Sequence, residues 1–220
     1  MKYLTEQRLC RALRKIFPTG HVSHEADIIR HPTLSRRFKP DYIVRVNAHN
    51  LVVEFDEVFH FTRMDNVVRD MQAQYAYLKA GYSVVRIPYF IQLDPHVSEA
   101  LFGWHTEAQP GDYSYGFPHG FVDMGAKRPI AFNIYGLGAY GYYIDALNTI
   151  SPGLRLDPVE LAFAHTAPFG RLEREGITCT KEDFPELLHT AKQAYTKLCA
   201  QHGHAPYAPL LSVDVAASFQ

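Results

Sequence analysis

The sequence predicts an α/β fold in which helices flank a mixed β-sheet. Two apolar, β-branched runs indicate neighbouring antiparallel strands, and a helix with an apolar stripe separates them from a third apolar run. Gly81 suits the C-terminal end of that helix, and Pro88 would stop the last strand. In the order strand, strand, helix and strand, the segments are residues 41–46, 51–55, 62–80 and 82–87.

Two further helices are expected near the ends of the chain. Residues 3–16 place Leu4, Leu9 and Leu13 close to helical spacing, and residues 181–202 carry a second amphipathic pattern. We expect residues 1–95 to form the α/β core. Residues 96–220 would form a C-terminal extension of α+β or irregular structure that packs on this core.

The composition excludes several classes of protein. With 47% hydrophobic residues, a chain of 220 residues can bury a sizeable core. No apolar run approaches the roughly 20 residues that a membrane span needs, and the N-terminus lacks the apolar segment of a signal peptide. We therefore expect a cytoplasmic protein with no membrane partner. Its three cysteines, Cys10, Cys179 and Cys199, are too far apart to indicate a disulfide framework or a zinc knuckle.

The charge is unevenly distributed along the chain. Residues 1–90 hold 14 Lys and Arg against 9 Asp and Glu, whereas residues 91–220 hold 8 against 14. A basic N-terminal part suits a phosphate-bearing partner, because neutralising phosphates releases counterions. Arg36, Arg37 and Lys39 are the candidates to hold a nucleic-acid backbone. An ordinary solvated loop is the alternative for this segment.

Carboxylates are expected to converge at one end of the predicted sheet. Side chains alternate along a strand, so Glu54 and Asp56 would point to the same face. Antiparallel pairing would bring Asp41, which follows Pro40, to the level of Glu54. Like charges repel unless shared protons or a divalent cation offset them, and hard oxygen ligands suit magnesium or manganese. The pattern therefore predicts a Mg²⁺ or Mn²⁺ site, with His60 close by.

The same stretch resembles a known family of nucleases. Glu54-Phe-Asp56-Glu-Val-Phe-His60, a helix and then Gly81-Tyr-Ser-Val-Val-Arg86 are similar to the PD-(D/E)xK nuclease superfamily, in the branch related to very-short-patch repair endonucleases and their uncharacterised bacterial relatives. The resemblance covers residues 1–90. It implies a restriction-endonuclease-like sheet flanked by helices and metal-dependent hydrolysis of DNA.

The resemblance also bears on the first helix and on two departures from the family pattern. The early glutamate of that helix, Glu6 here, faces the site in those proteins, and Glu25 is a rival for the role. Glu57 stands where the branch usually has glycine, and Asp56 replaces the lysine of the superfamily's Glu-x-Lys. The basic catalytic role would then fall to His60.

Taken together, these features predict a metal-dependent endonuclease that acts on DNA. Asp41 and Glu54 would be the metal ligands, with the carbonyl of Phe55 as a third ligand and Asp56 beside it. His60, with a pKa near neutrality, would orient or deprotonate the attacking water. Glu6 would hold a water of the metal shell. DNA is the expected partner, and a homodimer is compatible with this assignment.

Three further interpretations remain open from the sequence. The two departures favour an inactive nuclease fold that binds nucleic acid or protein. Gly136-Leu-Gly138-Ala-Tyr-Gly141 matches G-x-G-x-x-G after an expected strand at 130–135, which would instead indicate a nucleotide-binding C-terminal domain. Asp70 and Gln74 share one helix face and would either support the metal site or face solvent.

Overall fold

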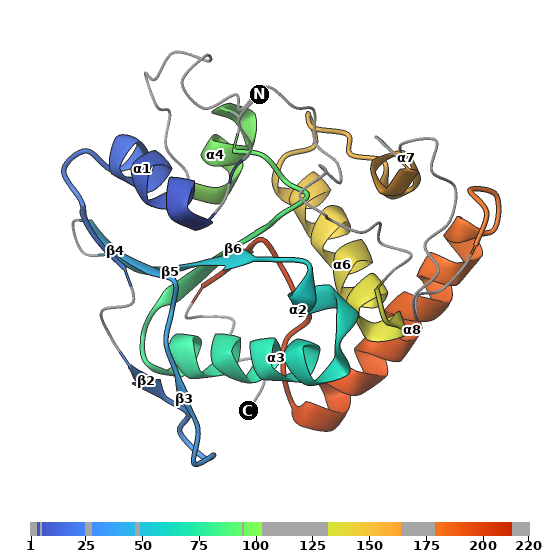
Figure 1. Ribbon diagram of the computed structural model, residues 1–220, viewed down its shortest axis with the longest axis horizontal. Helices are drawn as coiled ribbons and strands as arrows, with labels where there is room; N and C mark the ends of the chain where they lie inside the picture. Colours follow the sequence, from blue (N-terminus) through green and yellow to red (C-terminus); the bar gives the residue numbers. More distant parts are fainter. Residues whose placement is uncertain are drawn as a thin grey trace.

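The computed structural model describes residues 4, 6–24, 28–46, 49–93, 95–102, 132–163 and 179–212. These residues form an α/β fold with a mixed five-stranded sheet flanked by helices, as predicted (Figure 1). The order of strands in the sheet is β1-β4-β5-β6-β7. Their bounds are β1 His21–His24, β4 Tyr42–Val46, β5 His49–Asp56, β6 Ser83–Pro88 and β7 Leu210–Leu211. A separate two-stranded ribbon pairs β2 (Ile29–Arg30) with β3 (Arg37–Phe38).

The register of the central strands places the polar residues of the sheet. β4 and β5 are antiparallel, with Tyr42 opposite Val53, so Asp41 falls at the level of Glu54 one residue beyond this pair. β5 and β6 are parallel, with Glu54 opposite Arg86. A parallel pair needs a crossover, which α2 (Phe59–Thr62) and α3 (Met64–Lys79) provide.

Helices cover both faces of the sheet. α1 (Glu6–Ile16), α4 (Pro95–Phe102) and α6 (Ile134–Ile150) contribute to the main core, which includes Val53 and Val85. The opposite face presents Val52 and Val84, and these residues pack against the second half of α3. In Figure 1, α1 and α4 lie on one side of the strands and α3 lies on the other.

The C-terminal residues belong to the same packed body as the N-terminal strands. α7 (Pro158–Phe163) and α8 (Phe184–His202) contribute buried residues to the main core. α8 ends at His202 and is capped by Gly203, which adopts a left-handed conformation; the chain then returns to the sheet, where β7 pairs antiparallel with β6. Among the described residues, no helix is long and apolar enough to cross a membrane.

The glycines of the G-x-G-x-x-G match lie inside α6. A Cβ at Gly136 would be 1.9 Å from the Phe61 carbonyl oxygen, and one at Gly138 would be 2.4 Å from the Ala191 carbonyl oxygen. Ile134 begins the helix, so the expected strand at 130–135 is not formed by its last two residues; residues 130 and 131 lie outside the described chain. The motif therefore does not form the strand, turn and helix that the expected nucleotide-binding site would need. Its glycines instead allow α6 to approach α2 and α8 closely.

Candidate active site

The candidate site lies where β5 ends, on the face of the sheet that α3 covers. Residues two apart on a strand share a face, and Glu54 and Asp56 both point toward this side. Glu54 is 8% exposed and accepts a hydrogen bond from Tyr77 of α3, and Asp56 is 0% exposed. Phe55, between them, buries its side chain in the main core. The strand therefore places two carboxylates in a largely buried environment.

Asp41 joins this site from the residue before β4. Its Oδ2 accepts a hydrogen bond of 2.8 Å from the backbone N–H of Phe55. The pKa of Asp41 is raised to about 6, chiefly by burial and also by the negative charges of Glu6 and Asp56, while the Phe55 hydrogen bond and the charge of His60 oppose the rise. Asp41 is thus a carboxylate whose charge the protein alone does not fully compensate.

The charge of Glu54 is likewise not fully compensated by the protein. Burial raises the pKa of Glu54 well above its ordinary value, and the charge of Asp41 adds to this effect, while Arg86 and Tyr77 oppose it. Its Oε1 is buried and has no hydrogen-bond partner among the described residues. Two neighbouring carboxyl groups that resist ionisation, one with an unsatisfied buried oxygen, form a donor set that suits a hard divalent cation.

Asp56 is compensated by the protein itself. Arg86 Nε donates to its Oδ2 at 2.8 Å, Nη2 donates to its Oδ1, and the hydroxyl of Tyr207 donates to Oδ2. Burial would raise the pKa of Asp56, but the charges of Arg86 and His60 and these hydrogen bonds hold it below its ordinary value. Asp56 therefore remains ionised, as one half of a buried ion pair.

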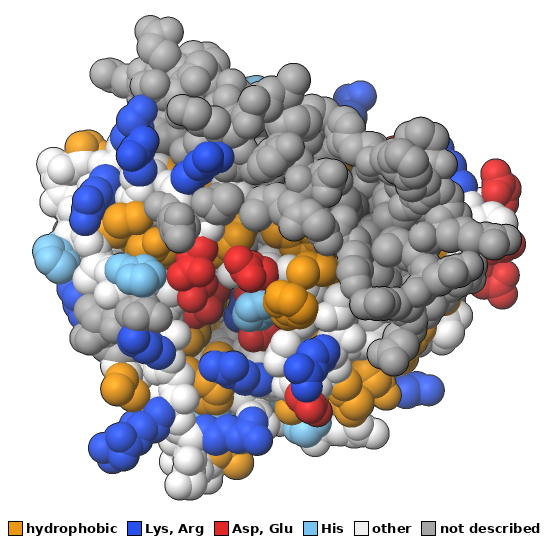
Figure 2. Space-filling model, in the orientation of Figure 1, with side chains coloured by type: hydrophobic (Ala, Val, Ile, Leu, Met, Phe, Trp, Pro, Cys, Tyr) orange, Lys and Arg blue, Asp and Glu red, His pale blue; other side chains and the backbone are white. Residues whose placement is uncertain are grey.

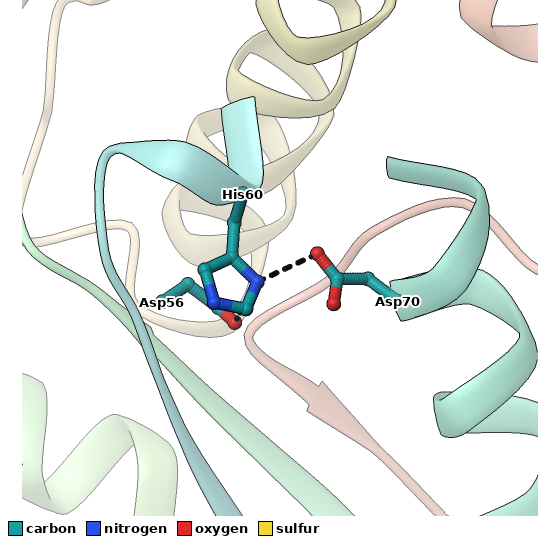
Figure 3. A group of neighbouring side chains, drawn as sticks. All are labelled: Asp56, His60 and Asp70. Carbon is teal, nitrogen blue, oxygen red and sulfur yellow. Dashed lines mark hydrogen bonds and ion pairs between the residues drawn. The ribbon is translucent and has the colours of Figure 1, made fainter. Parts of the chain in front are cut away.

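His60 connects this ion pair to α3. Its Nδ1 lies 2.8 Å from Asp70 Oδ2 and 3.4 Å from Asp56 Oδ1, so the imidazole is held between two carboxylates (Figure 3). Burial would lower the pKa of His60, but Asp70 and then Asp56 raise it to about 9, against the effect of Arg86. His60 is consequently an imidazolium at neutral pH. The near-neutral pKa expected from the sequence is wrong, and the charged ring can donate a proton.

A second group of possible ligands is present, but it carries its own cations. The ligand atoms of Asp56, His60 and Asp70 all lie within 4.8 Å of one another, which could hold a metal ion. However, Asp56 is already bound by Arg86, whose Nη2 is also 3.6 Å from Asp70. A metal here would compete with a guanidinium and an imidazolium. No such group among the described residues contains Asp41 or Glu54.

Glu6 lies near the site. It is in the first turn of α1, where its charge contributes to the raised pKa of Asp41 and its Oε1 is 3.4 Å from His24 Nε2. The rival residue Glu25 lies outside the described chain.

The three basic candidates lie on the loop and strand that precede Asp41. Arg36 donates a hydrogen bond of 2.7 Å to Gln72 of α3. Arg37, on β3, and Lys39 are exposed. The structure thus brings Glu6, Asp41, Glu54, Asp56 and His60 into one neighbourhood and leaves the basic residues on the adjoining surface.

Three residues of the site were not identified from the sequence. Arg86 had a detectable signal, because an arginine inside the apolar run Val84-Val85-Arg86-Ile87 must find a buried anion. Tyr77 and Tyr207 had none, since tyrosines at those positions fit an ordinary core. Asp70, for which a supporting role or solvent exposure had both been considered, contacts His60 directly.

Neither a protein-family model, nor a curated protein, nor a solved structure matches the chain. The resemblance to the PD-(D/E)xK superfamily therefore stays a prediction. The chemistry of the site follows from its own groups: two carboxylates that the protein compensates only in part, a buried carboxylate–guanidinium pair and an imidazolium that is 31% exposed.

Proposed function

We propose that the protein is a magnesium- or manganese-dependent endonuclease that hydrolyses phosphodiester bonds in DNA and has the restriction-endonuclease-like fold of the PD-(D/E)xK superfamily. One observation carries the proposal. Asp41 and Glu54 meet across two strands, both with a raised pKa, and Glu54 Oε1 has no hydrogen-bond partner among the described residues. A divalent cation would offset both charges and satisfy this oxygen.

Asp41 and Glu54 would hold the ion, with the carbonyl oxygen of Phe55 as the third ligand. When bound, such an ion supplies a Lewis acid for a phosphoryl oxygen and lowers the pKa of a water molecule. The hydrogen bond from Phe55 N–H fixes one oxygen of Asp41 and so orients the carboxylate. Glu6, whose charge reaches Asp41, would hold a water at the edge of the site.

The cationic groups would act on the phosphate and on each other. His60 is protonated at neutral pH and partly exposed, so it can stabilise negative charge on a phosphate or donate a proton to the leaving oxygen. Arg86 keeps Asp56 ionised, and Asp56 in turn favours the charged form of His60. The positive charge that the superfamily obtains from a lysine would here come from His60.

A second candidate function is a binding module without catalytic activity. It is favoured because Asp56, which stands at the superfamily's lysine position, already accepts hydrogen bonds from Arg86 and Tyr207. Calorimetric titration with Mn²⁺, together with a DNA cleavage assay, separates the two candidates. An enzyme should bind Mn²⁺ through Asp41 and Glu54 and cleave DNA, whereas a module of this kind should bind DNA without cleaving it.

The decisive experiment compares three variants in which a carboxylate is neutralised. Asp41→Asn and Glu54→Gln should abolish magnesium-dependent cleavage of plasmid DNA while the circular dichroism spectrum stays that of the wild type. Glu186→Gln, at an exposed carboxylate in the first turn of α8, is the matched control and should cleave normally. Cleavage by Asp41→Asn at the wild-type rate would contradict the proposal.

A further inference from the structure

A short basic ribbon projects from the fold beside the candidate site. We use this name for residues 28–39, which include β2, β3 and the turn between them. Figure 1 shows β2 and β3 at one edge of the molecule, below the strands of the main sheet. The ribbon contains four basic residues and no Asp or Glu, and only Pro40 separates its last residue from Asp41. Its position is therefore linked directly to a carboxylate of the site.

The ribbon is held rigidly on one face. Ile29 and Phe38 pair across its two strands and are buried against α3. At the turn, His31 Nδ1 accepts hydrogen bonds from the backbone N–H groups of Thr33 at 3.2 Å and Leu34 at 3.0 Å. Arg36 adds the hydrogen bond to Gln72 of α3. A ligand on the other face would thus meet a surface that is already ordered, which lowers the entropy lost on binding.

The free face of the ribbon carries two arginines side by side. Arg30 and Arg37 are directly opposite each other in the antiparallel register, so their side chains share one face, and both are exposed. Like charges in this arrangement destabilise a strand pair. Neither guanidinium forms an ion pair with a carboxylate of a described residue. An anion bound between them would offset this repulsion.

Figure 2 shows that this charge is part of a larger pattern. Lys and Arg side chains gather over the region of β2, β3 and α3, and a group of Asp and Glu side chains lies next to them on the same face of the molecule. A polyanion that spans both regions could place one phosphate at the carboxylates while its neighbours contact the ribbon. The match is electrostatic and requires no particular base sequence.

We propose that the basic ribbon binds the sugar-phosphate backbone of duplex DNA, with Arg30 and Arg37 both contacting one phosphate. This inference rests on the proposed function. A duplex is favoured over a single strand because single-strand sites present aromatic rings for base stacking. The aromatic rings of the ribbon, His31 and Phe38, are only 6% and 4% exposed. The exposed face offers charge without a stacking surface, so it fits a continuous backbone.

The test measures DNA binding without divalent cations, so that no cleavage occurs. Fluorescence anisotropy with two labelled duplexes of unrelated sequence, in EDTA and over a range of salt concentrations, gives Kd and its salt dependence. Arg30→Ala and Arg37→Ala should each weaken binding about fivefold or more, equally for both sequences. Each should also reduce the slope of log Kd against log salt by about 0.9.

Two controls separate the ribbon from general charge effects. Lys197→Ala removes an exposed charge from α8, outside the ribbon, and should leave both Kd and slope unchanged. Arg37→Lys keeps the charge and should retain the wild-type slope. The proposal is overturned if Arg30→Ala and Arg37→Ala bind as the wild type does, or if they weaken only the binding of a single-stranded oligonucleotide.

The outcome can be told apart from that of the proposed function. If the wild type cleaves plasmid DNA with magnesium but the ribbon variants bind normally, only the ribbon assignment fails. If the ribbon variants lose duplex binding but the wild type cleaves nothing, the assignment of the ribbon stands and the enzyme proposal fails.

Discussion

The guanidinium of Arg86 binds the carboxylate of Asp56 through two nitrogens, and both side chains are almost completely buried. The hydroxyl of Tyr207, from the segment after α8, donates to the same carboxylate, and the Arg86 guanidinium lies 5.2 Å from the centre of the Tyr207 ring. Residues from β5, β6 and the C-terminal segment therefore meet at one ion pair. The pair joins the candidate site to the part of the chain that completes the sheet.

Breaking this pair should strongly destabilise the protein. Arg86→Met would leave Asp56 buried and ionised without its main partner, and such a loss costs about 3–5 kcal/mol. We expect the midpoint of urea unfolding to fall accordingly. The double variant Asp56→Leu with Arg86→Met removes both charges and should recover most of the lost stability. If the double variant were less stable than Arg86→Met alone, the burial of an uncompensated charge could not be the cause.

The imidazolium of His60 should be visible in a titration. Its pKa is raised from 6.5 to about 9, so the charged form stabilises the fold. This stabilisation is complete below pH 6.5 and is lost as the pH rises through about 9. We expect the ring protons of His60 to titrate in NMR spectra near pH 9, and we expect the free energy of unfolding to decrease between pH 6.5 and 9.

Asp70 is the residue that should control this titration. Its charge and its hydrogen bond are the main causes that raise the pKa of His60, so Asp70→Asn should move the NMR titration toward lower pH. Asp65→Asn, at an exposed carboxylate in the first turn of α3, is the matched control and should leave it in place. An equal shift in both variants would show that general charge, and not this contact, sets the pKa.

Neutralising Asp41 should stabilise the metal-free protein. The pKa of this carboxyl rises from 3.8 to about 6 on folding, so the folded state holds the proton more tightly than the unfolded chain. Stability should therefore fall as the pH rises from about 4 to 6 and remain lower above that range. At pH 8, the free energy of unfolding of Asp41→Asn should be larger than that of the wild type by on the order of 2 kcal/mol.

Added metal should reverse the order of stability of Asp41→Asn and the wild type. Mn²⁺ binding to the folded state alone would raise the melting temperature of the wild type, and Asp41→Asn should show little or no such rise. Scanning calorimetry without Mn²⁺ and with Mn²⁺ at about 100 times its dissociation constant measures both effects. A metal-free wild type more stable than Asp41→Asn at pH 8 would contradict the assignment of Asp41 as an uncompensated carboxylate.

The sheet and the meeting of Asp41 with Glu54 could be predicted because they depend on local patterns. Apolar, β-branched residues define β4 and β5, and the short separation of the two strands in the sequence limits which residues can face each other. The partners of Asp56 could not be predicted, because Tyr207 reaches it only after the chain has formed α8 and returned to the sheet. The charge state of His60 depends on Asp70, whose role is decided by how α3 packs and not by its sequence spacing.

The G-x-G-x-x-G match failed for a related reason. The same three small residues suit a phosphate-binding turn and a close contact between helices, and only the surroundings decide between the two. Here, Gly136 approaches Phe61, and Gly138 approaches Ala191. The neighbouring helix was predicted, but the sequence does not show how near it lies.

Gly138→Ala should therefore destabilise the protein through packing. The added Cβ would lie 2.4 Å from the Ala191 carbonyl oxygen and 2.5 Å from Tyr195 Cβ, and neither atom can move without shifting α8. Alanine favours a helix by about 1 kcal/mol over glycine, but overpacking of a core typically costs about 1–3 kcal/mol and here involves backbone. We expect a net loss of stability in urea unfolding.

Two other glycines give a graded comparison for this variant. A Cβ at Gly141 would meet the ends of the Leu188 and Lys192 side chains at 2.9 and 3.0 Å, which can rotate away, so Gly141→Ala should cost less than Gly138→Ala. Gly153 has nothing within 4 Å, and Gly153→Ala should not be destabilising. If all three variants were equally stable, the close approach of α6 and α8 could not be what requires glycine at residue 138.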